Sequence, residues 1–261
     1  MNIAIIGVGA MGGAIADGLL NAGCVQGSDL WLANPHTEKL LHFQEKGANI
    51  GSDNRQAVAH AEIVFLCVKP WLAEQVLTEI KPALDYNTQT LVSVVAGLKG
   101  ERICQLLDKE GQQPQALLAI PNTAISVGQS MTFLVPASAD QEHTEQVAAL
   151  LRNVGKVMVT EERLLSAGMA LASCGIAYAM RYARAATEGG VELGIRATDA
   201  KDIVLQTMTG AAALLQQTGS NPEEEIDKVT TPGGYTIRGL NEMEHAGFSS
   251  AVIRGLKASI K

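Results

Sequence analysis

Three glycines near the start of the chain restrict its fold more than any other feature. Gly7, Gly9 and Gly12 form a G-x-G-x-x-G motif between an apolar run at 3–6 and an amphipathic stretch. In this context the first glycine makes a tight turn, the second lets a pyrophosphate approach the backbone, and the third lets helix and strand pack closely. The N–H groups of the helix N-terminus then bind phosphate. The motif predicts a dinucleotide-binding Rossmann-type domain; the alternative is a glycine-rich turn without a ligand.

Short apolar runs alternate with amphipathic stretches up to Thr160. We expect strands at 2–6, 30–33, 63–68, 90–95, 116–120, 131–135 and 156–159. We expect helices at 10–21, 38–46, 73–80, 100–109 and 140–153. Alternation of this kind predicts an α/β fold with a doubly wound, mostly parallel sheet covered on both faces.

The strand pattern ends near Thr160, where we place a domain boundary, giving domains 1–160 and 161–261. Helices are expected at 161–193, 199–217, 222–228, 234–246 and 248–259. Asn221 followed by Pro222 predicts a helix start, with an N-cap and a proline in the first turn. The stretch 164–190 is rich in Ala and Gly, and so poor in large side chains that it would make a thin core alone. We therefore expect an all-helical domain that forms a homodimer, with Gly168, Gly175, Gly189 and Gly190 packed closely between subunits.

Charge and composition exclude several classes of protein. The 20 Lys and Arg stand against 27 Asp and Glu, a net charge of −7, so a nucleic-acid partner is not expected. A hydrophobic content of 47% argues against disorder. The four cysteines and five histidines lack metal-ligand spacing, so no metal is expected. The chain starts without a basic leader, and the uncharged stretch 164–180 is shorter than the ~20 residues of a membrane span, so we expect a cytoplasmic protein without a membrane anchor.

The end of the second strand indicates which dinucleotide is bound. An NAD site usually has Asp or Glu there, but this chain has Asn34, Pro35, His36 and Thr37. A 2′-phosphate suits neutral donors and cations, which Asn34, His36 and Arg55 supply. We expect NADP(H) to be preferred, with NAD(H) as an alternative. Two further strand ends, 67–70 and 94–97, point to the same crevice, although Lys69 could equally be a solvated loop residue.

A second motif lies near the C-terminus, at residues 227–240. Thr231 and Pro232 suggest an N-cap followed by proline at the first helical position, with Gly233 and Gly234 at the helix mouth. Such a mouth presents N–H groups to an anion, here a substrate carboxylate. A capped helix start without a ligand is the alternative.

This C-terminal run resembles the signature of the pyrroline-5-carboxylate reductase family. The resemblance extends over the whole chain, including Val68-Lys69-Pro70, Pro121-Asn122-Thr123 and Gly189-Gly190-Val191. It implies a Rossmann domain followed by a helical domain interwoven with a second subunit, in dimers that commonly form decamers. The implied reaction is reduction of the C=N bond of 1-pyrroline-5-carboxylate to L-proline with NAD(P)H, the last step of proline synthesis.

The resemblance also implies roles for individual residues. Thr236 would hydrogen-bond the ring nitrogen, residues 231–235 (Thr231, Gly233, Gly234 and Tyr235 among them) would hold the carboxylate, and Glu162 would lie near the substrate. The positions that match cofactor contacts are Gly7, Val8, Gly9, Ala10, Met11, Gly12, Asn34, Asn54, Cys67, Val68, Lys69, Pro70, Val94, Val95 and Ala96.

The chain departs from the family pattern in two places. Leu118 stands where the family often has Arg, and Ala124 replaces a Pro. Ser173, Cys174 and Ile176 stand in a helix segment that typically reads Ser-Gly-Ser-Gly-Pro-Ala-Tyr, and the loss of Gly and Pro should straighten that helix. These changes bear on efficiency and on the exact substrate.

Two other functions are compatible with this architecture. One is an NADP-dependent reductase of another cyclic imine or small ketoacid, but a hydroxyacid dehydrogenase would need a Lys in the long helix, and none lies between Lys156 and Lys201. The other is a catalytically degenerate NADP-binding oligomer, against which the intact Gly233, Gly234 and Thr236 argue. A hydrolase is not expected, because the chain has no G-x-S-x-G elbow.

Overall fold

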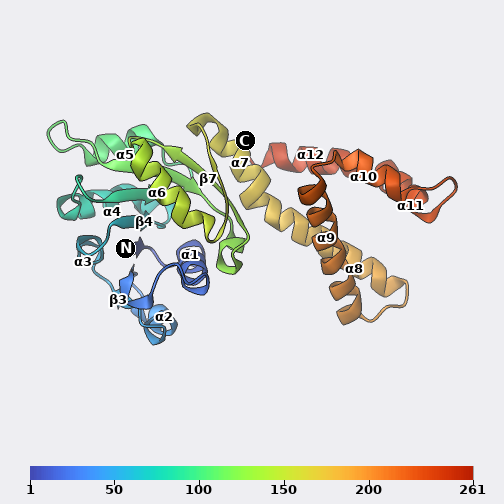
Figure 1. The fold of residues 1–261 in the computed structure, drawn as a ribbon, viewed down its shortest axis with the longest axis horizontal. Coiled ribbons are helices and arrows are strands. Elements are labelled where there is room, and N and C mark those ends of the chain that lie inside the picture. Colours follow the sequence, from blue (N-terminus) through green and yellow to red (C-terminus); the bar gives the residue numbers. More distant parts are fainter. Residues whose placement is uncertain (261) are drawn as a thin grey trace. The chain divides into compact units, whose positions relative to one another are not determined.

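We analysed a computed structural model of the chain, which describes residues 1–260. It divides into two compact units, Met1–Ser173 and the remainder from Cys174 onward (Figure 1). The family-based boundary near Thr160 stays a prediction, since compactness alone does not define a functional domain.

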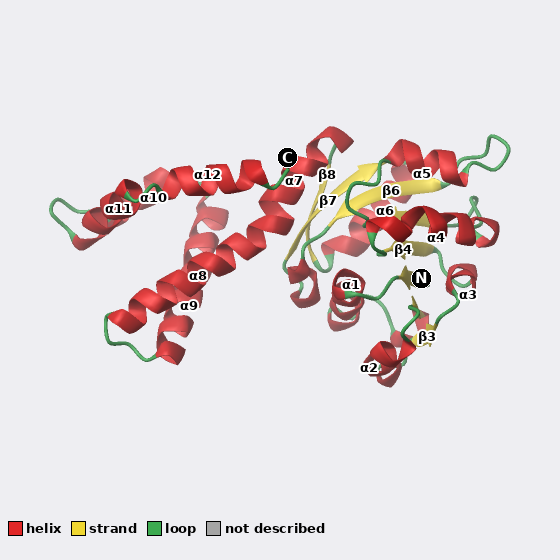
Figure 2. Cartoon of the chain, turned by 180° about the vertical axis from the view of Figure 1, so that it is seen from behind, coloured by secondary structure: helices red, strands yellow, loops and turns green. Residues whose placement is uncertain are grey.

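The first unit contains an eight-stranded sheet (Figure 2). The strands are β1 (Ile3–Ile6), β2 (Leu30–Ala33), β3 (Asn49–Gly51), β4 (Ile63–Leu66), β5 (Thr90–Ser93), β6 (Gln115–Ile120), β7 (Ser130–Pro136) and β8 (Gly155–Val159). Their order is β3-β2-β1-β4-β5-β6-β7-β8, and every neighbouring pair is parallel except β6 and β7. The expected doubly wound, mostly parallel sheet is confirmed.

Helices of the first unit follow the expected alternation. They are α1 (Ala10–Asn21), α2 (Leu41–Glu45), α3 (Asn54–Ala59), α4 (Ala73–Ile80), α5 (Gly100–Leu107), α6 (Gln141–Arg152) and α7 (Leu165–Gly168). Short 3₁₀ turns include η2 (Thr37–Leu40), η3 (Pro70–Leu72), η5 (Thr123–Val127) and η6 (Glu162–Leu164).

Side chains of each strand alternate between two cores, one on each face of the sheet. In β1, Ile3 and Ile5 join the core that includes α1, α2 and α6, whereas Ala4 and Ile6 join the core that includes α3, α4 and α5. Strands buried on both faces explain why they are apolar throughout rather than alternating in sequence.

Two elements, β3 and α3, were not expected from the sequence. β3 is a three-residue edge strand with one large apolar residue, Ile50, so it lacks an apolar run. α3 is six residues long, too short for a helical period to show, and depends on its cap: the Asp53 carboxylate accepts hydrogen bonds from Arg55 N and Gln56 N at 2.9 and 3.1 Å.

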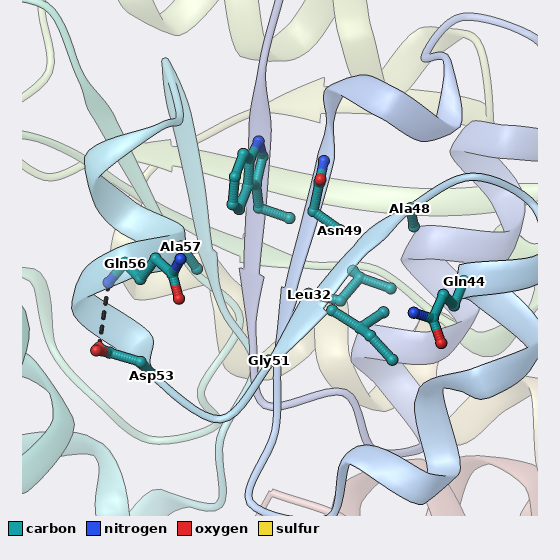
Figure 3. A pocket seen from close by; sticks show the side chains of 10 residues that line it. Leu32, Gln44, Ala48, Asn49, Gly51, Asp53, Gln56 and Ala57 are labelled. Carbon is teal, nitrogen blue, oxygen red and sulfur yellow. Dashed lines mark hydrogen bonds between the residues drawn. The ribbon is translucent and has the colours of Figure 1, made fainter.

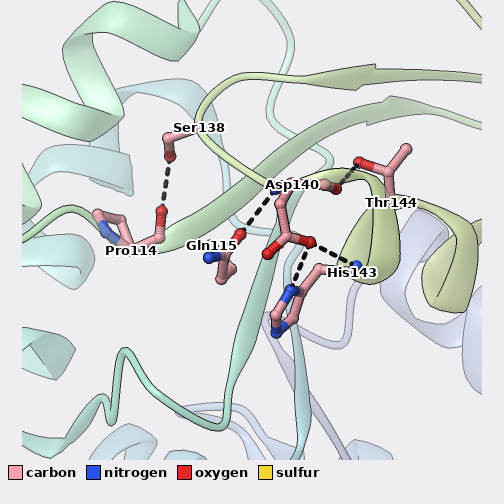
Figure 4. A network of polar contacts seen from close by, with 6 residues as sticks. All are labelled: Pro114, Gln115, Ser138, Asp140, His143 and Thr144. Carbon is pink, nitrogen blue, oxygen red and sulfur yellow. Dashed lines mark hydrogen bonds and ion pairs between the residues drawn. The ribbon is translucent and has the colours of Figure 1, made fainter.

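The start of α6 is held to the start of β6 by a polar network (Figure 4). Asp140 is the N-cap: its carboxylate accepts from the His143 backbone N–H at 2.9 Å and lies 2.8 Å from His143 Nδ1. The Asp140 backbone N–H donates to Gln115 Oε1 at 2.8 Å. Hydrogen bonding to the His143 backbone and side chain lowers the pKa of Asp140, so the cap remains ionised and stabilises the helix in mildly acidic solution.

The expected straight helix over 161–193 is wrong in its first part. After η6 and α7 the chain forms a π-helical segment, η7 (Met169–Cys174), before α8 (Gly175–Glu192). Its contacts account for the changed winding: Asn122 Nδ2 donates to Ala172 O at 3.4 Å, and Ser173 Oγ donates to Pro121 O at 2.8 Å. Gly168 was expected between subunits, but a Cβ there would lie 2.8 Å from the Phe133 ring, so its close packing is within the chain.

The second unit contains helices only. They are α8, α9 (Ala197–Thr218), α10 (Pro222–Val229), α11 (Tyr235–His245) and α12 (Phe248–Ala258). The predicted cap of α10 is confirmed, because Asn221 Oδ1 accepts from Glu223 N at 3.0 Å and Pro222 is the first helical residue. Ala200 is the one fully buried hydrophobic residue described in this unit, so its helices have almost no core within one chain.

Candidate functional site

The three motif glycines have three different structural reasons. Gly7 has φ +88°, and a Cβ there would lie 2.8 Å from Val68 Cγ1. A Cβ on Gly12 would lie 2.3 Å from Gly7 O, whereas a Cβ on Gly9 would meet nothing within 4 Å. The turn therefore needs two of its glycines for packing, and the bare backbone at Gly9 leaves room for a ligand. This fits a dinucleotide pyrophosphate at the N-terminus of α1.

The strand ends that carry the predicted cofactor residues are neighbours in the sheet. Gly7 N donates to Ala33 O at 2.9 Å, Cys67 N donates to Ile6 O at 2.8 Å, and Val94 N donates to Leu66 O at 2.9 Å. The strand order reverses between β1 and β4, which is where doubly wound sheets bind ligands. The structure thus brings four sequence segments together at one edge: 7–12, 34–36, 67–70 and 94–96.

Polar side chains after β2 are largely engaged within the chain. Asn34 Nδ2 donates to His36 O at 3.1 Å, and His36 Nδ1 lies 3.4 Å from the Glu38 carboxylate. At the start of α3, Asn54 Nδ2 donates to Glu79 Oε1 at 3.1 Å, which leaves the Asn54 oxygen free to accept a hydrogen bond.

Residues after β4 combine one inert group with exposed ones. Burial raises the pKa of the Cys67 thiol to about 12, so the thiol stays protonated and Cys67 serves as packing beside the glycine turn. Lys69 and Pro70 are exposed at the start of η3, and Trp71 after them is 77% exposed.

A hollow of about 370 Å³ lies directly beside the glycine turn. Its walls are Val8, Gly9, Ala10, Gly13, Ala14, Asp17, Lys39, His42, Phe43, Thr123 and Ser126. Three of these were predicted as cofactor residues. Lys39 and Thr123 were not assigned from the sequence, although the rule that places ligands at strand ends includes the segment after β2.

A second hollow, of about 230 Å³, lies at the carboxyl ends of β5 and β6. It contains the predicted Val95 and Glu162, and also Ser93, Lys99, Leu118 and Ser166. The sequence argument noted Leu118 as a departure from the family pattern. It gave no signal that Ser93, Lys99 and Ser166 would join Glu162, because they come from separate segments.

Glu162 is positioned by the N-terminus of α5. Gly100 N, the first residue of that helix, lies 3.3 Å from Glu162 Oε2 and donates to the carboxylate. A Cβ on Gly100 would lie 3.1 Å from Glu162 Oε2 and 2.7 Å from Ala137 Cβ. Glycine is therefore required for the carboxylate to reach this helix end, where the helix dipole favours negative charge.

A third hollow, of about 370 Å³, contains none of the predicted residues (Figure 3). It lies at the outer strands β2 and β3, between Trp31, Gln44, Asn49 and Gln56. The polar groups drawn there have structural partners: Asp53 caps α3, and Asn49 Nδ2 donates to Ser28 O at 2.8 Å.

The predicted substrate motif forms a turn in the second unit, and this corrects one expectation. Thr231 and Pro232 are not the N-cap and first residue of a helix. Gly234 N donates to Thr231 O at 2.9 Å, with Pro232 second and Gly233 third at φ +70°, the pattern of a type II turn. The helix α11 begins at Tyr235 with Gly234 as its N-cap, because only after this turn does the chain adopt helical angles.

Side chains around this turn are accessible. Arg238 Nη2 donates to Gly233 O at 2.9 Å and the guanidinium lies 5.3 Å from the Tyr235 ring centre, which fixes the turn. Thr236 is exposed and, among residues 1–260, its hydroxyl has no hydrogen-bond partner. The helix mouth and this hydroxyl are both open to a ligand.

Over the described residues, no group of three or more His, Cys, Asp or Glu side chains is arranged to hold a metal ion. One helical stretch, Glu162–Glu192, is long and apolar enough to cross a membrane by length and composition, a criterion that interface helices of soluble proteins also meet.

The fold and the glycine turn define a Rossmann-type, two-unit dinucleotide-binding oxidoreductase. Residues 2–97 match the family model described as NADP oxidoreductase, coenzyme F420-dependent, and residues 162–261 match pyrroline-5-carboxylate reductase dimerisation.

Individual relatives support the second match. Pyrroline-5-carboxylate reductase 2 of Dictyostelium discoideum is 37% identical over 99% of this chain and 90% of its own length. Pyrroline-5-carboxylate reductase 1 of the same organism is 39% identical over 98% of this chain, which spans about half of that protein (48%). The solved 1-pyrroline-5-carboxylate reductase of Streptococcus pyogenes is 30% identical, with a TM-score of 0.85 over 100% of this chain and 96% of that one. The chain belongs to the pyrroline-5-carboxylate reductase family.

Proposed function

We propose that the chain reduces the C=N bond of 1-pyrroline-5-carboxylate to L-proline, with NADPH as preferred reductant and NADH as an alternative. The observation that carries the proposal is the open turn and helix mouth at residues 231–236, within the stretch that matches the family's dimerisation model. Family membership over nearly the whole chain supports it.

The first unit would hold the cofactor. Free N–H groups at the start of α1 bind the pyrophosphate above the bare backbone of Gly9, and Asn54 offers its free oxygen to a donor on the adenosine. Small residues at 94–96 allow a nicotinamide ribose to lie against the backbone. When bound, the dihydronicotinamide supplies a hydride to the imine carbon.

The second unit would hold the substrate. The N–H groups at Gly234 and Tyr235 suit a carboxylate, because they belong to the N-terminal end of α11. The Thr236 hydroxyl, one residue further, hydrogen-bonds the ring nitrogen. A cyclic imine is basic enough to be partly protonated in water, so its carbon is already electrophilic and the chain has to align it rather than supply a strong acid. We place Glu162 near the substrate as a carboxylate compatible with the protonated ring.

The helical unit would form a homodimer. Its helices expose large apolar side chains, including Met180 (63%), Leu193 (85%) and Ile203 (54%), which a stable soluble protein covers. We propose that these faces and the apolar stretch of Glu162–Glu192 pack on a second subunit in the cytoplasm rather than in a membrane, and that dimers assemble further, to a decamer. No nucleic acid is involved.

The decisive experiment follows NADPH oxidation at neutral pH with 1-pyrroline-5-carboxylate, and separately with small ketoacids. We expect turnover with the pyrroline and formation of L-proline. Turnover of a ketoacid without turnover of the pyrroline would assign a different reductase, and NADPH binding without any turnover would indicate a degenerate oligomer.

A substitution tests the substrate end. We expect Thr236→Val to lower kcat about 10- to 100-fold, the loss of a hydrogen bond to a charged group, while NADPH affinity stays unchanged. Thr218→Val is the matched control, because the Thr218 hydroxyl donates to Leu214 O of its own helix at 2.8 Å. Loss of NADPH binding in Thr236→Val would contradict the assignment of this segment to the substrate.

A further inference from the structure

The hollow beside the glycine turn carries a positive charge that no acid in the described chain neutralises. Lys39, in η2, lines this hollow together with Val8, Gly9 and Ala10, and it makes no ion pair within residues 1–260. Asp17 also lines the hollow, but its carboxylate is bridged to Lys46 Nζ at 2.8 Å. In a chain of net charge −7, a hollow with a free lysine favours an anionic ligand.

The floor of the hollow is bare backbone. A Cβ on Gly9 would meet nothing within 4 Å, and a Cβ on Gly13, one turn later, would meet Val8 Cγ1 only at 4.0 Å. The first turn of α1 has no side-chain cap and no acidic residue, so its N–H groups are available to phosphate. A pyrophosphate occupies those N–H groups, which leaves Lys39 for a different phosphate.

His36, the histidine expected at the 2′-phosphate, has another neighbour. Its Nδ1 lies 3.4 Å from the Glu38 carboxylate, and His36 is not among the residues that line the hollow. Lys39 stands three residues further along the same segment after β2, the part of a Rossmann fold that meets the adenosine ribose.

We propose that Lys39 is the specificity-determining residue that binds the 2′-phosphate of NADP(H) in the hollow lined by Val8, Gly9 and Ala10. The inference rests on the proposed function only in requiring that the chain binds NADP(H). Lys39 acts through charge and hydrogen bonding, and it has no part in hydride transfer.

The test is equilibrium binding of NADP⁺ and NAD⁺ to the purified protein by calorimetry, without substrate. We expect Lys39→Met to weaken NADP⁺ binding 10- to 100-fold and NAD⁺ binding less than threefold, and Lys39→Arg to retain most of the NADP⁺ affinity. Lys156→Met is the matched control: Lys156 is exposed on β8, so the same change of net charge there should leave both affinities unchanged.

Three outcomes would overturn the proposal. Unchanged NADP⁺ affinity in Lys39→Met shows that another group binds the phosphate. Equal losses for NADP⁺ and NAD⁺, with an unchanged Tm, place Lys39 at the pyrophosphate. A larger effect of His36→Ala than of Lys39→Met on the NADP⁺ to NAD⁺ ratio returns the role to His36. Binding of neither nucleotide by the wild type would instead refute the proposed function, and normal binding without pyrroline reduction would refute the reaction while leaving Lys39 testable.

Discussion

The Ser173 hydroxyl donates a 2.8 Å hydrogen bond to the carbonyl oxygen of Pro121. This bond connects the π-helical segment Met169–Cys174 to the loop after β6, at a position where the family pattern resembled by this chain has Gly. A side chain that departs from the pattern therefore makes a contact that glycine cannot make.

We expect Ser173→Ala to lower the free energy of unfolding by about 1 kcal/mol, the usual net value of one hydrogen bond. Urea denaturation followed by circular dichroism measures it. Ser52→Ala is the control, since Ser52 is exposed and makes no hydrogen bond within residues 1–260. Equal stability of the Ser173 variant and wild type would show that water replaces the bond without loss.

The motif glycines provide a matched pair of substitutions. Gly12→Ala places a Cβ 2.3 Å from Gly7 O, so we expect it to destabilise the fold by about 1–3 kcal/mol or more. Gly9→Ala has open space and an extended backbone (φ −91°), so its Tm should equal that of wild type. Its NADPH affinity should nevertheless fall at least about tenfold, because the methyl group occupies the approach to the backbone. Unchanged affinity in a well-folded Gly9→Ala would remove the pyrophosphate from this turn.

The contact between Glu162 and Gly100 can be followed at a single amide. Glu162→Ala should speed hydrogen exchange of the Gly100 N–H measurably, whereas Glu162→Gln keeps an acceptor oxygen and should slow it again. Gly100→Ala should cost about 1–3 kcal/mol of stability, because its methyl group meets Ala137 and the carboxylate. Exchange that is the same in all three Glu162 forms would mean that the carboxylate does not cap α5 in solution.

Cys67 predicts a loss of stability in alkali. Burial raises the pKa of its thiol to about 12 in the folded chain, whereas an unfolded thiol ionises near pH 8.5. Above that pH the unfolded state binds fewer protons than the folded state, so the free energy of unfolding should fall by about 1.4 kcal/mol per pH unit from about pH 9 towards pH 12. Below pH 8 this contribution is constant.

Chemical denaturation between pH 7 and 10 checks the slope, with Cys67→Ala as the variant that should lack it. In the folded wild type, Cys67 should also resist a thiol-specific disulfide reagent at pH 8 until the protein is unfolded. Rapid labelling of Cys67 under native conditions would contradict the burial.

Much of the fold could be predicted from local patterns. The apolar strands, the glycine turn and the capped start of α10 are written in consecutive residues, because burial on both faces, a tight turn and an N-cap each impose their own residue types. The elements that were missed, β3 and α3, are too short to show a period. The Thr231–Gly234 segment was recognised but given the wrong geometry, because Pro suits the second position of a type II turn as well as the first turn of a helix.

The sequence by itself determined that a dinucleotide fold begins the chain, that a carboxylate is absent at the end of β2, and that a thin-cored helical half follows. Only the tertiary structure decided that Gly12 is needed for Gly7 O, that Gly100 makes room for Glu162, and that Lys39 rather than His36 lines the hollow at the glycine turn. Consecutive residues set backbone propensity and burial, whereas the meeting of side chains from strands and helices far apart in the chain depends on how the sheet orders its strands.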